Sequence, residues 1–523
     1  MELKNNSPIE KAISSGHSEL LRFGTALLFI ICIMLFVELQ SPIAGSKMML
    51  IIAAMIGGYM ALNIGANDVA NNVGPAVGSQ AMTLGGAIVI AAIFEASGAL
   101  IAGGDVVSTI KKGIIDPAQI TDTDTFVWLM MAALLAAAAW LNLATAVGAP
   151  VSTTHSIVGG VLGAGIAAGG IGIANWSKMS AIAASWVISP LLGGLIAAAF
   201  LYLIKRTITY REDRLEAAKK IVPLLLAIMA WSFSTYLMLK GLKKIWKLDF
   251  ATAAAVGAFI SLVIYMLVRP AIAKAADKLS NDKNSINNLF TLPLVFAAAG
   301  LSFAHGANDV ANAVGPLAAI NEAIVAGGVT SKAQIPLWVM MVGAIGIALG
   351  LALYGPKLIR TVGSEITELN KMRAFCIAMA ASITVIIASQ LGLPVSSTHI
   401  AVGGVFGVGF LREYLKTNYG SMLEEIKHHH DDDDPEAVEA FLEDFQSASL
   451  QRKTELLGKL KAKSTRAHLT KSERKALGKI HKKDLVKRSH LWKIAAAWII
   501  TVPASGFMAA MVYYIIRGIM LPN

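Results

Sequence analysis

The sequence has little charge and almost no cysteine. Charged residues make up 15% of its 523 positions and hydrophobic residues 55%, whereas soluble domains carry about 25% charged residues. This composition excludes an ordinary soluble globular protein. The two cysteines, Cys32 and Cys376, both lie in apolar runs, which excludes a disulfide framework and a cysteine-based metal cluster. We interpret both as small core residues.

The hydrophobic residues gather in blocks long enough to cross a membrane, since about 20 helical residues span the roughly 30 Å of bilayer hydrocarbon. The first block follows a polar stretch with Glu2, Lys4 and Glu10, so we interpret it as a retained span and not as a signal peptide. The pattern predicts an all-α polytopic membrane protein with about 12–13 hydrophobic segments, at 21–40, 48–66, 84–104, 127–147, 152–170, 182–204, 222–240, 250–269, 288–305, 336–355, 374–391, 395–412 and 494–517.

Two motifs each occur twice, in the same order. The first begins at Gly65 and again at Gly306, and ten of its eleven positions are identical: Gly-Ala-Asn-Asp-Val-Ala-Asn-(Asn or Ala)-Val-Gly-Pro. The second begins at Pro150 and Pro394 and reads Pro-Val-Ser-(Thr or Ser)-Thr-His. The first motif precedes the second by 87 residues in one half and by 90 in the other. The sequence therefore predicts two related halves.

The distribution of basic residues predicts that the halves are inverted. Segment 169–180 follows the second motif of half one and holds one basic residue, whereas the equivalent segment 412–493 is long and strongly basic. Basic loops mark the cytoplasmic side, so these equivalent points lie on opposite sides of the membrane. Inverted repeats with broken or re-entrant helices and a site at their interface are typical of secondary transporters. A parallel duplication is the alternative.

The net charge of +11 has the same origin. It is concentrated in loops at 205–220 and 453–493, so it indicates the cytoplasmic side and contact with anionic lipid of the bilayer, and no nucleic-acid partner. The cluster His428–Asp434 is either a loose metal site or, as we favour, a solvated loop tip. The predicted organisation is a tail and extra first span (1–47), repeat 1 (48–204), connecting spans and basic loops (205–287), repeat 2 (288–412), a cytoplasmic charged insert (413–493) and a last span (494–523).

Asp68 and Asp309 place a carboxylate in apolar surroundings, where an unpaired charge costs several kcal/mol. Asparagines stand one residue before and three residues after each, and the asparagine three residues after shares a helix face with the aspartate. Carboxylate and amide oxygens suit a hard cation such as Na⁺, and the glycines and proline of the motif favour a helix break that frees carbonyls. The alternative is a polar seam between helices. The predicted cation ligands are Asn67, Asp68, Asn308 and Asp309.

The second motif predicts an anion site. A proline favours a helix start, and the hydroxyls after it would lie at a helix N-terminus beside unpaired N–H groups. Two inverted copies can hold one tetrahedral oxyanion between them. A serine–histidine nucleophile is disfavoured, since a hydrolase is not built by duplicating it in two membrane halves. The predicted anion ligands are Ser152, Thr153, Thr154, Ser396, Ser397 and Thr398, with Asn71 and Asn312 beside them.

Two titratable residues occur in one half only. Glu95 lies mid-span in half one, where an unpaired glutamate indicates a role in binding the coupling ion or a proton, with a structural hydrogen bond as the alternative. His305 has Ile64 as its counterpart, and it either titrates near neutrality or is a hydrogen-bonded packing residue. We assign His305, His155 and His399 to a gating or proton role.

The two doubled motifs resemble those of the inorganic phosphate transporter (PiT) family, whose members move phosphate with Na⁺ or H⁺. Phe94–Glu95 and Thr109–Gly113 resemble a segment of its sodium-coupled members. The resemblance covers about 48–204 and 289–410. It implies cation sites at the Asn-Asp pairs, phosphate at residues 152–154 and 396–398, and a role for His305 in transport. Ala378 replaces a second glutamate found in some members, and some relatives carry sulfate.

We therefore predict a transporter and no enzyme: a cell (inner) membrane protein that imports inorganic phosphate by alternating access. The coupling ion is Na⁺, bound at the Asp68 and Asp309 sites, in preference to H⁺, and no cofactor is expected. Phosphate and the lipid bilayer are the predicted partners, and a homodimer is compatible with the sequence. A sulfate permease of the same fold is the alternative, followed by an anion channel or a phosphate sensor.

Overall fold

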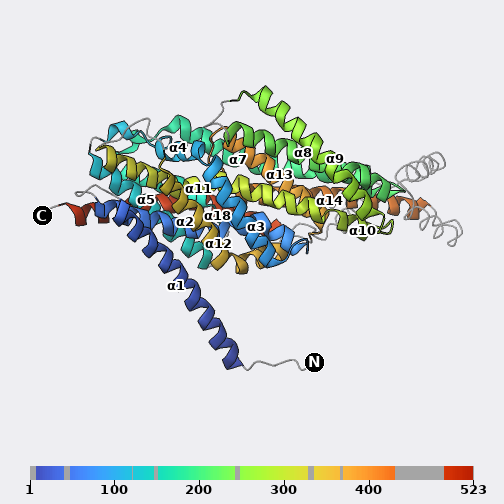
Figure 1. Ribbon diagram of the computed structural model, residues 1–523, viewed down its shortest axis with the longest axis horizontal. Coiled ribbons are helices and arrows are strands. Elements are labelled where there is room, and N and C mark those ends of the chain that lie inside the picture. The colour runs from blue at the N-terminus through green and yellow to red at the C-terminus, as the bar shows by residue number, and fades with distance from the viewer. Residues whose placement is uncertain are drawn as a thin grey trace.

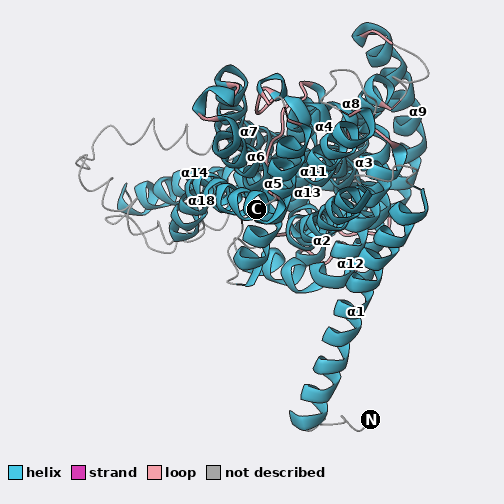
Figure 2. Ribbon diagram, turned by 90° about the vertical axis from the view of Figure 1, so that its left-hand side faces the viewer, coloured by secondary structure: helices cyan, strands magenta, loops and turns pink. Residues whose placement is uncertain are grey.

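The computed structural model describes residues 8–40, 47–120, 122–146, 151–241, 248–327, 335–365, 369–429 and 488–521. Within these ranges nearly every residue is helical, and the one β-type contact is an isolated antiparallel bridge between Ile115 and Ala174. The long helices lie side by side in a single bundle (Figure 1). Figure 2 shows the same bundle without a strand among the described residues. The all-α prediction is confirmed.

The helices follow one another with short connections. In chain order they are α1 (Pro8–Gln40), α2 (Lys47–Gly78), α3 (Leu84–Ala102), α4 (Gly104–Lys112), η1 (Pro117–Gln119), α5 (Thr123–Ala146), α6 (Thr153–Gly169), η2 (Ile171–Ile173), α7 (Trp176–Ile204), η3 (Lys205–Thr209), α8 (Arg214–Lys240), α9 (Phe250–Ala276), α10 (Lys283–Leu289), α11 (Thr291–Ala326), α12 (Leu337–Glu365), α13 (Lys371–Gln390), α14 (Ser397–His429) and α18 (Arg488–Met520).

Each predicted hydrophobic block falls mainly within a helix, and the chain is a multi-pass membrane protein. Ten described helices are long and apolar enough to cross a membrane, or eleven if α10 and α11, bent by 41° where they join, form one span. The remaining two blocks form α6 and the first part of α14. These helices begin inside the second motif, so their apolar stretches are shorter than a full crossing.

The first motif does not break its helix, contrary to our expectation. α2 continues through Gly65 and Pro75, and α11 continues through the equivalent Gly306 and Pro316. The glycines serve close packing instead. A Cβ added at Gly65 would lie 1.9 Å from the Ile347 carbonyl oxygen of α12, and one at Gly306 would lie 2.1 Å from the carbonyl oxygen of Glu95 in α3. Small residues let membrane helices approach this closely. The bend lies elsewhere, at the α10–α11 junction.

The two halves exchange partners. α2 of half one packs on α12 of half two, and α11 of half two packs on α3 of half one. In the same way α6 packs on α18, and α14 packs on α7. Both motif-bearing helices of each half therefore contact the other half, which places all four motif copies at one interface.

Glycine pairs lie at the α6–α18 and α14–α7 contacts. A Cβ at Gly163 of α6 would lie 2.1 Å from the carbonyl oxygen of Gly506 in α18. A Cβ at the equivalent Gly407 of α14 would lie 2.0 Å from the carbonyl oxygen of Gly194 in α7. The matching pairs show that α18 packs against α6 in the same way as α7 packs against α14.

The remaining elements lie around this core. α8 and α9 pack together as a pair at 214–276, and α1 contacts α2 while its first turns project from the bundle (Figure 2). α14 extends to His429. Residues 430–487 lie outside the described residues, so the predicted cytoplasmic insert and most of the His428–Asp434 cluster receive no structural account.

Candidate functional site

The second motif forms a helix N-terminus in both halves, as predicted. Ser152 precedes the first turn of α6, and its Oγ accepts a hydrogen bond from the backbone N–H of His155 at 3.2 Å. Ser396 Oγ accepts from the backbone N–H of His399 at 3.3 Å in the same way. A serine at this position satisfies one of the free N–H groups of the first turn. Neither histidine ring has a hydrogen-bond partner of normal geometry, so the structure contains no serine–histidine nucleophile here.

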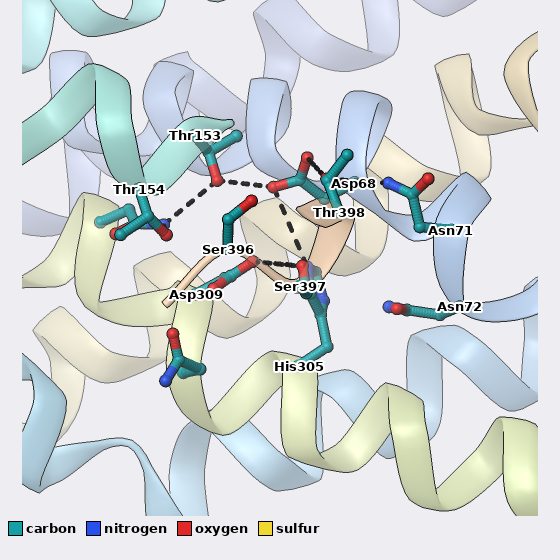
Figure 3. Close-up of polar contacts among 12 residues, drawn as sticks. Asp68, Asn71, Asn72, Thr153, Thr154, His305, Asp309, Ser396, Ser397 and Thr398 are labelled. Carbon is teal, nitrogen blue, oxygen red and sulfur yellow. Dashed lines mark hydrogen bonds and ion pairs between the residues drawn. The ribbon is translucent and has the colours of Figure 1, made fainter. Parts of the chain in front are cut away.

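The hydroxyls of this motif meet the carboxylates of the first motif (Figure 3). Thr153 Oγ1 donates to Asp68 Oδ2 at 2.5 Å, and Ser397 Oγ donates to Asp309 Oδ2 at 3.0 Å. These are equivalent contacts within each half. Thr398 of half two also donates to Asp68, at 3.2 Å from Oδ1. Asp68 thus receives hydroxyls from both copies of the second motif.

Two predicted asparagines join the halves. Asn71 Nδ2 donates to Thr398 Oγ1 at 2.9 Å, and Asn312 Nδ2 lies 3.2 Å from the Oγ1 atoms of both Thr153 and Thr154. Each asparagine therefore contacts the hydroxyls of the other half. Figure 3 shows the threonines of both motif copies converging here.

The other two asparagines hold the backbone at the start of the second motif. Asn67 Nδ2 donates to the Val151 carbonyl oxygen at 3.3 Å, and Asn308 Nδ2 donates to the Leu393 carbonyl oxygen at 3.2 Å. Asn308 Nδ2 also donates to Ser389 Oγ at 3.1 Å. The Asn308 Oδ1 atom is buried without a hydrogen-bond donor in the described structure and is free to serve as a ligand.

His305 brings the carboxylates together. Its Nδ1 lies 3.1 Å from Glu95 Oε1, and its Nε2 lies 2.8 Å from Asp309 Oδ2 and 3.9 Å from Asp68 Oδ2. All four side chains are at most 2% exposed. Among the described residues, no lysine or arginine forms an ion pair with these three carboxylates. One imidazole is therefore their shared basic partner, supplied by the half that lacks Glu95.

Asn72 belongs to this cluster and was missed by the sequence analysis. Its Nδ2 donates to Glu95 Oε1 at 2.8 Å. The available signal was that Asn72, with Ala313 as its counterpart, is the one position at which the two copies of the first motif differ. The asparagine occurs in the half that contains Glu95, and it donates a hydrogen bond to that glutamate.

The cluster has the ligands for a cation. One atom each of Asp68, His305 and Asp309 lies within 4.8 Å of the others. Several side-chain oxygens around them are buried without a hydrogen-bond donor in the described structure: Asn72 Oδ1, Glu95 Oε2, Asn308 Oδ1, Asp309 Oδ1 and Asn312 Oδ1. A purely structural polar seam would pair such atoms, because an unpaired buried acceptor costs about 1–3 kcal/mol. Oxygen ligands of this kind suit a hard cation.

The two motif histidines lie against each other and against two tryptophans. The ring centroids of His155 and His399 are 4.4 Å apart, and Trp186 and Trp498 flank them. Both tryptophans were missed, because each stands in an apolar span with no polar motif nearby. The predicted gating or proton role of His155 and His399 stays a prediction.

The Thr109–Gly113 segment also reaches the second half. Thr109 Oγ1 donates to the Gly392 carbonyl oxygen at 2.7 Å, in the turn before α14. Lys111 forms a buried ion pair with Glu322 of α11. Ala378, where some relatives of the resembled family have a glutamate, lies in the apolar core of α13.

Comparison with known proteins identifies the family. Residues 64–509 match the model of the phosphate transporter family, which is most of the chain. The chain belongs to this family. Its members are transporters, so the prediction that the protein is no enzyme is confirmed.

Relatives in the family are similar over long stretches. A Helicobacter pylori protein assigned as a phosphate permease is 53% identical over 98% of both chains, and one from Pyrococcus abyssi is 40% identical over 69% of this chain and 89% of its own. A solved structure described as the sodium-dependent phosphate transporter is 31% identical. It covers 91% of this chain and 100% of its own, with a TM-score of 0.74. The family transports phosphate, and the hydroxyl-lined interface between the halves suits the same kind of anion.

Proposed function

We propose that this protein imports inorganic phosphate across the cell membrane, coupled to a cation and by alternating access, with Na⁺ favoured over H⁺. The relatives assigned as phosphate permeases and the sodium-dependent transporter of known structure support the substrate and the ion. The chemistry of the site supports both the substrate and the ion.

Phosphate is held at the N-termini of α6 and α14. The hydroxyl residues of both motif copies line this place, namely Ser152, Thr153, Thr154, Ser396, Ser397 and Thr398, and Asn71 and Asn312 bind their threonines. Helix N-termini attract anions through free N–H groups and the helix dipole. Two such termini offer a tetrahedral anion donors from both sides, without an arginine.

The cations bind at the first motif. Asp68 and Asp309 supply the charge, and Asn67, Asn308 and Glu95 supply further oxygens. His305 lies at the centre of these acids, so it competes with Na⁺ whenever it carries a proton. The site therefore links Na⁺ occupancy to the protonation of one residue.

One observation carries the coupling: Asp68 accepts hydroxyl hydrogen bonds from both Thr153 and Thr398. A cation on Asp68 weakens its hold on these two hydroxyls, because the carboxylate charge is then shared with the ion. The hydroxyls are released to donate to phosphate. The cation also offsets the charge of the anion. Cation binding thereby prepares the phosphate site in both halves at once.

Inverted repeats give this site access to either side in turn. The contrast in basic residues between the equivalent segments 169–180 and 412–493 supports an inverted arrangement. The α6 and α14 N-termini meet at the interface between the halves, where Thr154 Oγ1 donates to the Val395 carbonyl oxygen. The equivalence of α7 and α18 extends repeat 2 beyond the insert to the last span. Rocking of one repeat against the other then exposes the shared site alternately. The basic segment 413–493 faces the cytoplasm in this arrangement.

Phosphate uptake into proteoliposomes tests the proposal. We expect uptake of labelled phosphate under an imposed inward Na⁺ gradient, less under an inward H⁺ gradient, and little with neither. Uptake indifferent to both gradients contradicts coupling and indicates a channel. Phosphate binding without flux indicates a sensor. Sulfate added in excess is expected to compete weakly, and equal uptake of sulfate would instead make the protein a general oxyanion permease.

A further inference from the structure

Four aromatic rings form one continuous stack across the interface between the halves. Trp186 of α7 lies against His155 of α6, with ring centroids 3.9 Å apart. His155 meets His399 of α14 edge to face, at 4.4 Å and 88°. His399 in turn stacks on Trp498 of α18, at 3.6 Å and 26°. The stack thus runs from one half to the other through both motif histidines.

The stack is built symmetrically from the two halves. Both histidines end a copy of the second motif. Trp186 lies eight residues before Gly194, the glycine of α7 that packs on α14. Trp498 lies eight residues before Gly506, the glycine of α18 that packs on α6. Equivalent residues therefore supply each position of the stack.

The rings are the main partners of the two imidazoles. His155 and His399 are 4% and 1% exposed, and none of their four ring nitrogens makes a hydrogen bond of normal geometry. The backbone of Trp498 lies beside the His155 ring. An edge-to-face contact turns the positive edge of one ring toward the negative face of the other, which stabilises the pair.

The stack is tied to the phosphate-binding termini. His155 and His399 each follow directly the last hydroxyl residue of their motif, Thr154 or Thr398. Trp186 Nε1 also donates to the Pro394 carbonyl oxygen at 3.0 Å, so α7 of half one holds the start of the motif of half two. A shift of either ring therefore moves a helix N-terminus that carries the hydroxyls.

We propose that this ring stack positions the two helix N-termini, setting the separation at which they bind a tetrahedral anion. His155 and His399 are then positioning residues: they touch each other, and they act on phosphate through the helices that carry them. This inference rests on the proposed function of the site. It predicts that the stack determines phosphate affinity and the preference for phosphate over a larger tetrahedral anion, more than it determines the maximal rate.

Leucine substitutions test the stack, because leucine fills much of the volume but has no ring. In proteoliposomes, H155L and H399L are expected to raise the KM for phosphate about tenfold, with a less than about threefold change in maximal rate, and to reduce the preference for phosphate over arsenate. The double variant H155L/H399L is expected to raise the KM by less than the product of the two single effects, since both single variants already remove the His155–His399 contact. H155F keeps a ring and is expected to stay within about threefold of the unmodified KM.

Phe410→Ala is the matched control. Phe410 lies on α14, stacks on Phe406 with centroids 5.9 Å apart and is 43% exposed, so its loss is expected to leave the KM unchanged. Thermal unfolding in detergent shows whether each variant folds. Should a leucine variant not fold, W498L removes the stack from α18 and carries the same expected change in KM.

A KM for phosphate within about twofold of the unmodified protein in the folded leucine variants overturns the inference. T398V separates it from the proposed function, because it removes a hydroxyl directly. A raised KM in T398V together with an unchanged KM in H155L contradicts the positioning role alone. Failure of the unmodified protein to take up phosphate contradicts the proposed function, and the positioning role with it.

Discussion

His305 Nδ1 lies 3.1 Å from Glu95 Oε1, although each residue occurs in only one half of a duplicated sequence. The two asymmetric residues of the repeat are therefore partners. They are buried beside Asp68 and Asp309, which occur in both halves. A pseudo-symmetric scaffold thus contains a charge cluster that is not symmetric, and the cluster lies where the cation is expected to bind.

Neutralising one member of this pair changes the charge balance of the buried cluster that Glu95 and His305 form with Asp68 and Asp309. We expect E95Q and H305Q each to lower the initial rate of Na⁺-driven phosphate uptake about tenfold. The double variant E95Q/H305Q is expected to be no slower than the single variants, because interacting residues are not additive. Uptake measured against Na⁺ concentration checks this. Losses that multiply in the double variant would show that the two residues act independently.

Asp68 and Asp309 are expected to be indispensable. Replacing either by asparagine keeps the shape and removes the charge that a cation requires, so D68N and D309N should each lower uptake about a hundredfold or more. D249N is the matched control: Asp249 caps α9 through Thr252, and asparagine caps a helix equally well. Thermal unfolding should show all three variants folded. Full activity in D68N and D309N would return both residues to a structural role.

Close helix packing at the first motif predicts a strict requirement for glycine. In G65A the new Cβ would lie 1.9 Å from the Ile347 carbonyl oxygen, so α2 and α12 must separate. We expect a loss of about 1–3 kcal/mol in the free energy of unfolding. G85A is the control, since a Cβ at Gly85 meets nothing within 4 Å. Unfolding in detergent measures both, and equal stability of G65A and G85A would argue against the contact.

The Lys111–Glu322 pair joins α4 to α11 in a buried position. K111M removes the ammonium group that pairs with the Glu322 carboxylate. We expect this to lower the free energy of unfolding by about 3–5 kcal/mol. Because an apolar pair can replace a buried ion pair, K111M/E322L should recover most of the loss. K112M, at the neighbouring and less buried lysine, is expected to have little effect. A melting temperature of K111M equal to that of K112M would contradict the pairing.

The sequence alone determined the membrane-spanning helices, the duplication and the residue types of the site. Apolar blocks identify spans because a bilayer imposes length and hydropathy on each segment separately. The doubled motifs identified Asp68, Asp309 and the Ser/Thr groups because polar residues are costly at membrane depth. These signals are local, so they can be read without knowing which helices meet.

Only the tertiary structure decided which of these residues meet. Asn72 and His305 reach Glu95, and Trp186 and Trp498 reach the motif histidines, through contacts between helices far apart in the chain. The predicted break at Gly65 was wrong for the same reason: the glycine is there for a neighbouring helix, and not for its own backbone. Sequence spacing reports the face of one helix, whereas the partner of that face is set by how all the helices pack.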